Sequence, residues 1–117
     1  MLQLTPERLA AVYDMLRAFP PFCRWQLPPA SVVKFHILKT DKWQADWWLE
    51  GNTHHIRVSE KKHGHLVSLI ESMAHEMVHV RQRIAKTETK GDHNAEFRKL
   101  AERICKALGF DVGQFLG

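Results

Sequence analysis

Residues 73–80, "MAHEMVHV", place His75, Glu76 and His79 inside an otherwise apolar segment. Apolar residues recur around them with helical spacing over about 64–86, which predicts a long amphipathic helix. An α-helix turns about 100° per residue, so the two histidines lie about 40° apart, one turn from each other. Both rings can therefore reach one point beside the helix, nearly opposite its apolar stripe. The stripe consists of Leu66, Leu69, Ile70, Met73, Met77, Val80 and Ile84.

A third histidine opens the next predicted helix, in the segment 93–109, "HNAEFRKLAERICKALG", for which we expect Asp92 as the cap and Gly109 as the end. This segment has an apolar stripe of its own. His93 falls in line with that stripe, one turn before Phe97. We therefore expect His93 to face inward, where it can meet His75 and His79.

Three histidines placed in this way match the chemistry of zinc. Zinc prefers tetrahedral sites, and catalytic zinc sites use three protein ligands and keep one position for water. The metal lowers the pKa of that water to about 7, and a carboxylate directly after the first histidine can take its proton. The sequence predicts a Zn²⁺ site formed by His75, His79 and His93, with Glu76 as the general base.

The third ligand has an alternative on the same helix. Glu96 lies about 60° from His93 around that helix, so it can also face the histidine pair. Glu88 falls in a polar loop and Glu102 points away from the apolar stripe, and we expect both in solvent. The sequence leaves the choice between His93 and Glu96 open.

The remaining segments predict an α+β fold. Residues 5–19 are typical of an N-terminal helix, with Thr5 as the cap and Pro6 in the first helical position. Short segments rich in β-branched and aromatic residues follow, and Gly51-Asn52 suggests a tight hairpin between the last two. We expect a small antiparallel sheet of three or four strands, with strands in 32–39, 43–50 and 54–59.

Side-chain alternation assigns the aromatic residues to the faces of this sheet. Trp43 and Trp47 are expected on one face and Trp48 on the other. His54 and His55 follow each other in a strand, so one should face the core and the other solvent. The tryptophans are expected to serve mainly in core packing, with a substrate rim or a stacking surface for single-stranded DNA as the functional alternative.

Composition limits the class of protein. The 117 residues predict a single domain spanning 1–117, and 44% apolar with 26% charged residues is ordinary for a globular protein. The two cysteines form no CxxC pair, and the first residues carry charges, so we expect a cytoplasmic protein with reduced thiols. No apolar run is long enough for a membrane span. The net charge of +4 comes from scattered residues, which permits contact with DNA without arguing for it.

The motifs resemble those of the SprT-like zinc metalloproteases, the family of the Spartan protease domain. The resemblance covers about residues 30–110 and depends on "AHEMVHV" and, after a charged loop, "GDHNAEFRKLAERI". The family's third-ligand segment has the form H-G-x-x-F; here Asn94 stands in place of glycine, and Phe97 is present. The resemblance implies a minimal zincin-like fold, zinc on His75, His79 and His93, and Glu76 as general base. Because these 117 residues contain only two cysteines, we do not expect the C-terminal four-cysteine zinc ribbon that several relatives have.

Two functions are compatible with these patterns. The first is a zinc-dependent peptidase whose protein or peptide substrate lies extended along an edge strand, expected at 54–59. The second is a non-catalytic module that binds nucleic acid or protein, with a structural zinc or no metal. Basic residues near the histidines would form one rim of the site and provide the DNA contact: Lys61, Lys62, Arg81, Arg83, Lys86 and Lys90.

Overall fold

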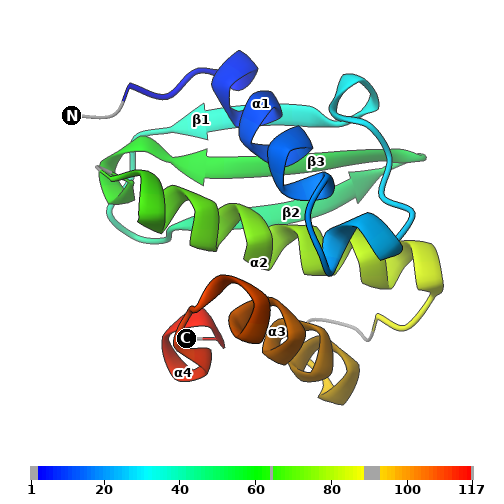
Figure 1. Ribbon diagram of the computed structural model, residues 1–117. Coiled ribbons are helices and arrows are strands. Elements are labelled where there is room, and N and C mark those ends of the chain that lie inside the picture. Colours follow the sequence, from blue (N-terminus) through cyan, green and yellow to red (C-terminus); the bar gives the residue numbers. More distant parts are fainter. Residues whose placement is uncertain (1–2, 64, 89–92, 117) are drawn as a thin grey trace.

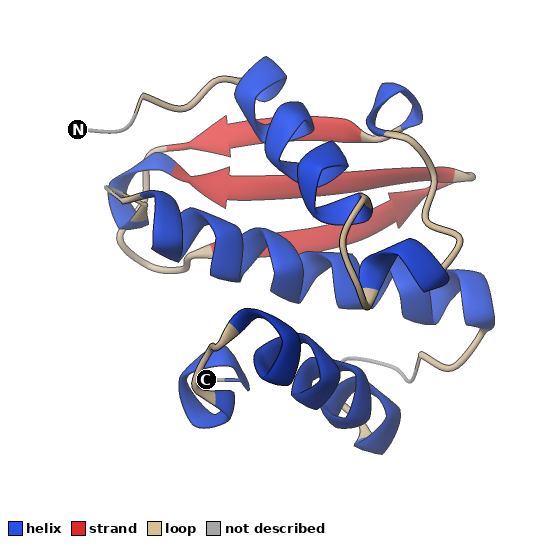
Figure 2. Ribbon diagram, viewed as in Figure 1, coloured by secondary structure: helices blue, strands red, loops and turns tan. Residues whose placement is uncertain are grey.

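The computed structural model describes residues 3–63, 65–88 and 93–116 and has an α+β architecture (Figures 1 and 2). Three strands form one sheet, and three short 3-10 helices lie in the connections: Phe22–Arg24, Ala30–Val32 and Glu60–Lys62. The helices and strands of these residues are α1 (Pro6–Arg17), β1 (Lys34–Leu38), β2 (Ala45–Glu50), β3 (Thr53–Ser59), α2 (Leu66–Ala85), α3 (Ala95–Leu108) and α4 (Val112–Leu116).

The sheet is mixed, so the prediction of an antiparallel sheet is wrong for one of its strands. The strand order is β1-β3-β2; β2 and β3 are antiparallel, whereas β1 and β3 are parallel. The antiparallel pair is joined by Gly51 and Asn52, with Gly51 at φ 61°, which confirms the predicted tight turn. β3 takes the central place because it carries Ile56 and Val58, which are fully buried. Periodicity within a strand does not reveal this order.

The predicted helices are present, and their ends follow local chemistry. The Thr5 side chain accepts a hydrogen bond from the Arg8 backbone N–H at 3.1 Å, which confirms it as the cap of α1. The cap of α3 is Asn94 instead of the expected Asp92, which lies outside the described residues. Gly109 ends α3 with φ 81°, as predicted.

α2 is the central element of the molecule. α1 and α2 cover one face of the sheet, and α3 and α4 pack against α2 on the side away from the strands (Figure 1). α2 is therefore buried on two sides, although its predicted stripe is exposed at both ends, at Leu66 and Ile84. The main buried apolar side chains around it are Leu9, Tyr13, Leu16, Ile56, Val58, Leu69, Met73, Met77, Val80, Phe97, Leu100 and Ile104.

The two faces of the sheet differ in character. Cross-strand register places Phe35, Ile56 and Trp47 on the face toward α1 and α2. On the other face, Trp48 stacks on His55, with ring centroids 4.8 Å apart. His54, by contrast, contacts Trp47 on the helix side, so the two neighbouring histidines lie on opposite faces as predicted, but the His55 side chain is only 12% exposed and does not lie in solvent.

Trp43 departs from its predicted position. It precedes β2, and its ring lies 4.8 Å from the guanidinium of Arg57. The same guanidinium lies 5.1 Å from the Trp48 ring. Trp43 thus lies near Trp48, on the other side of the Arg57 guanidinium, and not, as alternation suggested, near Trp47.

No helix in the described part of the chain has the length and apolar character that a membrane span needs.

Candidate metal centre

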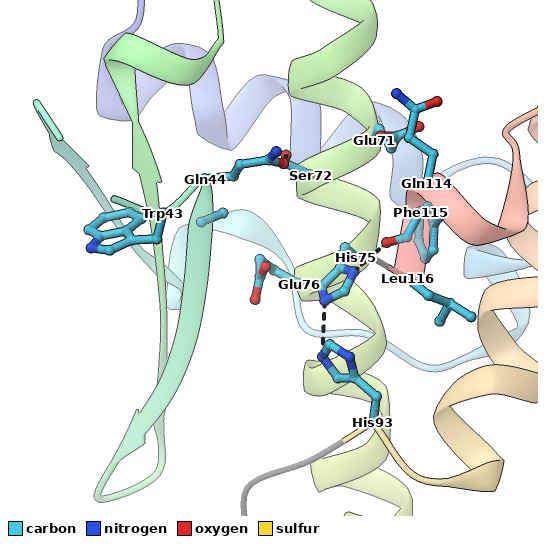
Figure 3. A pocket seen from close by; sticks show the side chains of 11 residues that line it. Trp43, Gln44, Glu71, Ser72, His75, Glu76, His93, Gln114, Phe115 and Leu116 are labelled. Atoms are coloured by element: carbon cyan, nitrogen blue, oxygen red, sulfur yellow. Dashed lines mark hydrogen bonds between the residues drawn. The ribbon is translucent and has the colours of Figure 1, made fainter. Parts of the chain in front are cut away.

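His75, His79 and His93 converge beside α2, as the sequence predicted. One ring nitrogen from each lies within 4.8 Å of the corresponding nitrogens of the other two, an arrangement that could hold a metal ion. Figure 3 shows His75 and His93 pointing toward each other from α2 and from the segment before α3. Their Nε2 atoms are 3.2 Å apart. Two nitrogen ligands of a tetrahedral zinc ion are separated by about 3.3 Å, so the spacing of this pair is compatible with two ligands of one such ion.

The orientation of His75 is set by the C-terminal helix. Its Nδ1 lies 3.0 Å from the backbone carbonyl of Phe115, which belongs to α4. A carbonyl only accepts hydrogen bonds, so Nδ1 carries the proton and Nε2 keeps its lone pair for a metal. The Phe115 ring also packs on the His75 ring, at 5.5 Å between centroids.

His79 is supported by the sheet. Its ring stacks on Trp47 with an interplanar angle of 12° and centroids 5.8 Å apart. The Trp47 indole N–H in turn donates to His54 Nδ1 at 3.1 Å. Trp47 therefore links β2 and β3 to the second histidine of the cluster, in addition to filling the core.

Phe97 contributes an apolar wall that touches all three histidine rings. Its centroid lies 5.0, 4.8 and 4.1 Å from those of His75, His79 and His93. Burial here lowers the pKa of His75 to about 4 and that of His79 to about 3, and neighbouring histidines add to both shifts. These two imidazoles are neutral at pH 7, the form that binds metals.

Glu76 is only 5% exposed although it is a carboxylate. Burial, with a smaller contribution from the negative charge of Asp46, raises the pKa of Glu76 to about 8. Its side chain points from α2 toward the β2 side of the site, whereas His75 points toward His93 (Figure 3). A carboxyl with such a pKa can take up a proton near neutral pH.

A pocket of about 290 Å³ adjoins the cluster, with His75, Glu76 and His93 in its wall. Trp43 and Gln44 line it from the start of β2, and α4 closes another side with Gln114, Phe115 and Leu116 (Figure 3). An acid, a possible metal position and a cavity for a ligand therefore meet at one place.

The carboxylates considered as alternative ligands lie elsewhere. Glu96 lines a separate groove together with Arg24, Arg81 and Arg103, and it is not among the residues that converge with His75 and His79. Glu88 is engaged by Arg83, at 2.7 Å. Glu102 is exposed on α3, as expected.

The predicted basic rim is partly engaged in other contacts. Arg81 donates to the Trp25 carbonyl at 2.8 Å, and Lys61 lies 3.7 Å from the Asp41 carboxylate. Arg83 pairs with Glu88. Lys90 lies outside the described residues. Arg83 and Lys61 of the predicted rim therefore pair with carboxylates, whereas Arg81 is engaged by a backbone carbonyl.

Several supporting groups could not be found by reading the motifs. The Phe115 carbonyl carries no side-chain signal, and Trp47 was expected to serve mainly in core packing, with a substrate rim or a DNA-stacking surface as the alternative, and not as a support for His79. His63, which the motifs do not include, is 1% exposed, with Nδ1 2.7 Å from the Ser59 carbonyl and Nε2 2.7 Å from Ser72 Oγ. It ties α2 to the end of β3 beside the pocket.

Comparison with known proteins adds no assignment to this geometry: no protein-family model and no curated protein matches the sequence.

Proposed function

We propose that the protein is a zinc-dependent peptidase with a minimal zincin-like fold, in which His75, His79 and His93 hold the metal and Glu76 is the general base. The observation that carries the proposal is the convergence of three histidine nitrogens within 4.8 Å next to a buried glutamate and a pocket. The HExxH motif and the resemblance to SprT-like metalloproteases support the same function.

The roles of the residues follow from their positions. When bound, zinc would supply Lewis acidity, which polarises a substrate carbonyl and makes water acidic near neutral pH. Glu76 would take the proton from the attacking water and later deliver it to the leaving amine. Burial raises the pKa of the Glu76 carboxyl to about 8 in the metal-free chain, and a bound cation would lower it, which brings the carboxyl into the range for proton exchange near neutral pH.

The substrate is expected along a different strand from the one the sequence suggested. β3 is paired on both sides, so the expectation of an edge strand at 54–59 is wrong. β2 has one free edge, and Trp43, Gln44 and Ala45 at its start line the pocket. We propose that an extended peptide adds to the free edge of β2 and passes the pocket beside Glu76.

The test is Glu76→Gln, compared with wild type at equal zinc content in a casein-cleavage assay. The variant should keep one equivalent of zinc and lose cleavage by about 10²-fold or more, because a neutral amide cannot accept the proton. Glu102→Gln on the exposed side of α3 is the matched control and should cleave like wild type. Cleavage by Glu76→Gln at the wild-type rate would show that the assignment is wrong. Zinc binding without any hydrolysis by wild type would favour a non-catalytic module.

A further inference from the structure

The three histidines of the candidate metal centre are not held in the same way. His75 and His79 lie within α2, whose backbone hydrogen bonds set their separation. His93 precedes Asn94, the cap of α3, and therefore lies outside both helices. Its position relative to the other two must come from other contacts.

A buried amide on α2 makes such contacts. Gln82 lies three residues after His79, and its side chain is 1% exposed. Its Nε2 donates to Asn94 Oδ1 at 2.8 Å and to the Thr87 carbonyl at 3.3 Å. Asn94 Nδ2 donates to the same carbonyl at 2.8 Å. We call Gln82, Thr87 and Asn94 the amide clamp.

The amide clamp connects the chain just after α2 with the chain just before α3. The Thr87 backbone N–H donates to the Gln82 backbone carbonyl at 2.9 Å, and this bond holds Thr87 against the end of α2. On the other side, Asn94 Oδ1 also accepts from the Phe97 backbone N–H at 2.9 Å, so the cap of α3 is part of the same network. Buried amides are costly unless their hydrogen bonds are made, so this geometry tolerates little displacement.

We infer that Gln82 is a positioning residue for the third metal ligand: through Asn94 it sets the backbone of His93 against His75 and His79. The inference rests on the proposed metal centre. Hydrogen-bonding partners that orient metal ligands typically change affinity by about 10–100-fold when removed. Loss of the Gln82 amide should therefore weaken metal binding although every ligand is still present.

The test measures the zinc dissociation constant by chelator competition for wild type, Gln82→Met and Arg81→Met. Methionine keeps the length and helical preference of glutamine but has no donor. Arg81→Met is the matched control, because it removes a hydrogen bond from α2 to the Trp25 carbonyl that involves neither Asn94 nor His93. We expect about tenfold weaker zinc binding for Gln82→Met and a change within about twofold for Arg81→Met. Wild-type affinity in Gln82→Met would overturn the inference.

A double-mutant cycle distinguishes positioning from a general loss of stability. In a His93→Ala background, Gln82→Met should have no further effect on zinc affinity, because the ligand it positions is gone. An equal loss in both backgrounds would overturn the inference. If Gln82→Met does not fold, Asn94→Ser decides, since serine can cap α3 but is too short to reach Gln82: weaker zinc binding supports positioning, and unchanged binding overturns it.

These measurements also separate the inference from the proposed function. Wild type that binds no zinc would overturn both. Wild type that binds zinc and cleaves casein, with an unaffected Gln82→Met, would overturn only the role of Gln82.

Discussion

In the absence of a metal, the ionised side chain of Glu76 lowers the stability of the folded protein. Its pKa in the folded chain, about 8, lies above the ordinary value of 4.5, because its carboxyl is buried near Asp46. For a carboxyl with a raised pKa, the stabilising contribution is complete below about pH 4.5 and is lost as the pH rises through 8. The residue that we propose for proton transfer is thus held where its ionisation opposes folding.

The metal-free protein should therefore gain stability from Glu76→Gln at neutral and alkaline pH. The gain should grow between pH 4.5 and 8 and reach on the order of 4 kcal/mol, because the neutral amide cannot ionise. Urea unfolding in the presence of a chelator measures it. Glu102→Gln, at an exposed site, should show no such pH-dependent gain. A difference between wild type and Glu76→Gln that stays constant over this pH range would contradict the explanation.

At the level of single residues, local spacing predicted which histidines converge but not the groups that hold them in place. His75 and His79 are four residues apart on one helix, so helical geometry alone brings them together. His93 was placed correctly because it follows the stripe of its own helix. Gln82 and Asn94 come into contact only when α3 packs on α2. No pattern in the sequence indicates that their side-chain amides form a hydrogen bond.

Among the elements, α4 is the least expected contributor to the site. It is short, and its Phe115 carbonyl reaches His75 Nδ1 at 3.0 Å. The Phe115 side chain is 3% exposed and anchors this helix. α4 therefore both closes one side of the pocket and fixes the donor orientation of the first histidine.

Phe115→Ala should release α4 and weaken zinc binding about tenfold, because His75 loses the carbonyl that orients it. It should also cost about 3 kcal/mol in stability, as large-to-small changes in a core do. The control is Phe110→Ala: Phe110 stacks on Phe115 at 6.2 Å and is partly buried. The control should lose stability but keep most of its zinc affinity, as read by chelator competition. Equal zinc affinity in wild type and Phe115→Ala would rule out an orienting role for α4.

Helices and strands differ in how far the sequence determined them. Caps and apolar periodicity are local, so α1, α2 and α3 were predicted within a few residues. The positions of the strands were predicted as well. Their order in the sheet was not, because it depends on which strand forms hydrogen bonds with two neighbouring strands. Because β3 lies between β1 and β2, it cannot be the edge strand that binds the substrate, and we propose β2 in its place. The cap at Asn94 was also missed, since Asp92 has an equally suitable side chain.

In the molecule as a whole, the candidate metal centre lies where two parts of the chain meet. One part is the sheet with α1 and α2, and the other is the pair α3 and α4, which packs on α2 (Figure 1). Two of the three histidines come from the first part, and the third comes from the entry to the second. A metal bound by all three would connect the two parts, and the pocket beside it is lined by residues from both.

Metal content and affinity in the single alanine variants of the three histidines test this account most directly. Wild type should bind one equivalent of zinc, and His75→Ala, His79→Ala and His93→Ala should each lose it or bind it at least about tenfold more weakly. His36→Ala, which removes a histidine on the opposite face of the sheet, should bind like wild type. A His93→Ala protein that binds zinc as tightly as wild type would contradict the proposed centre.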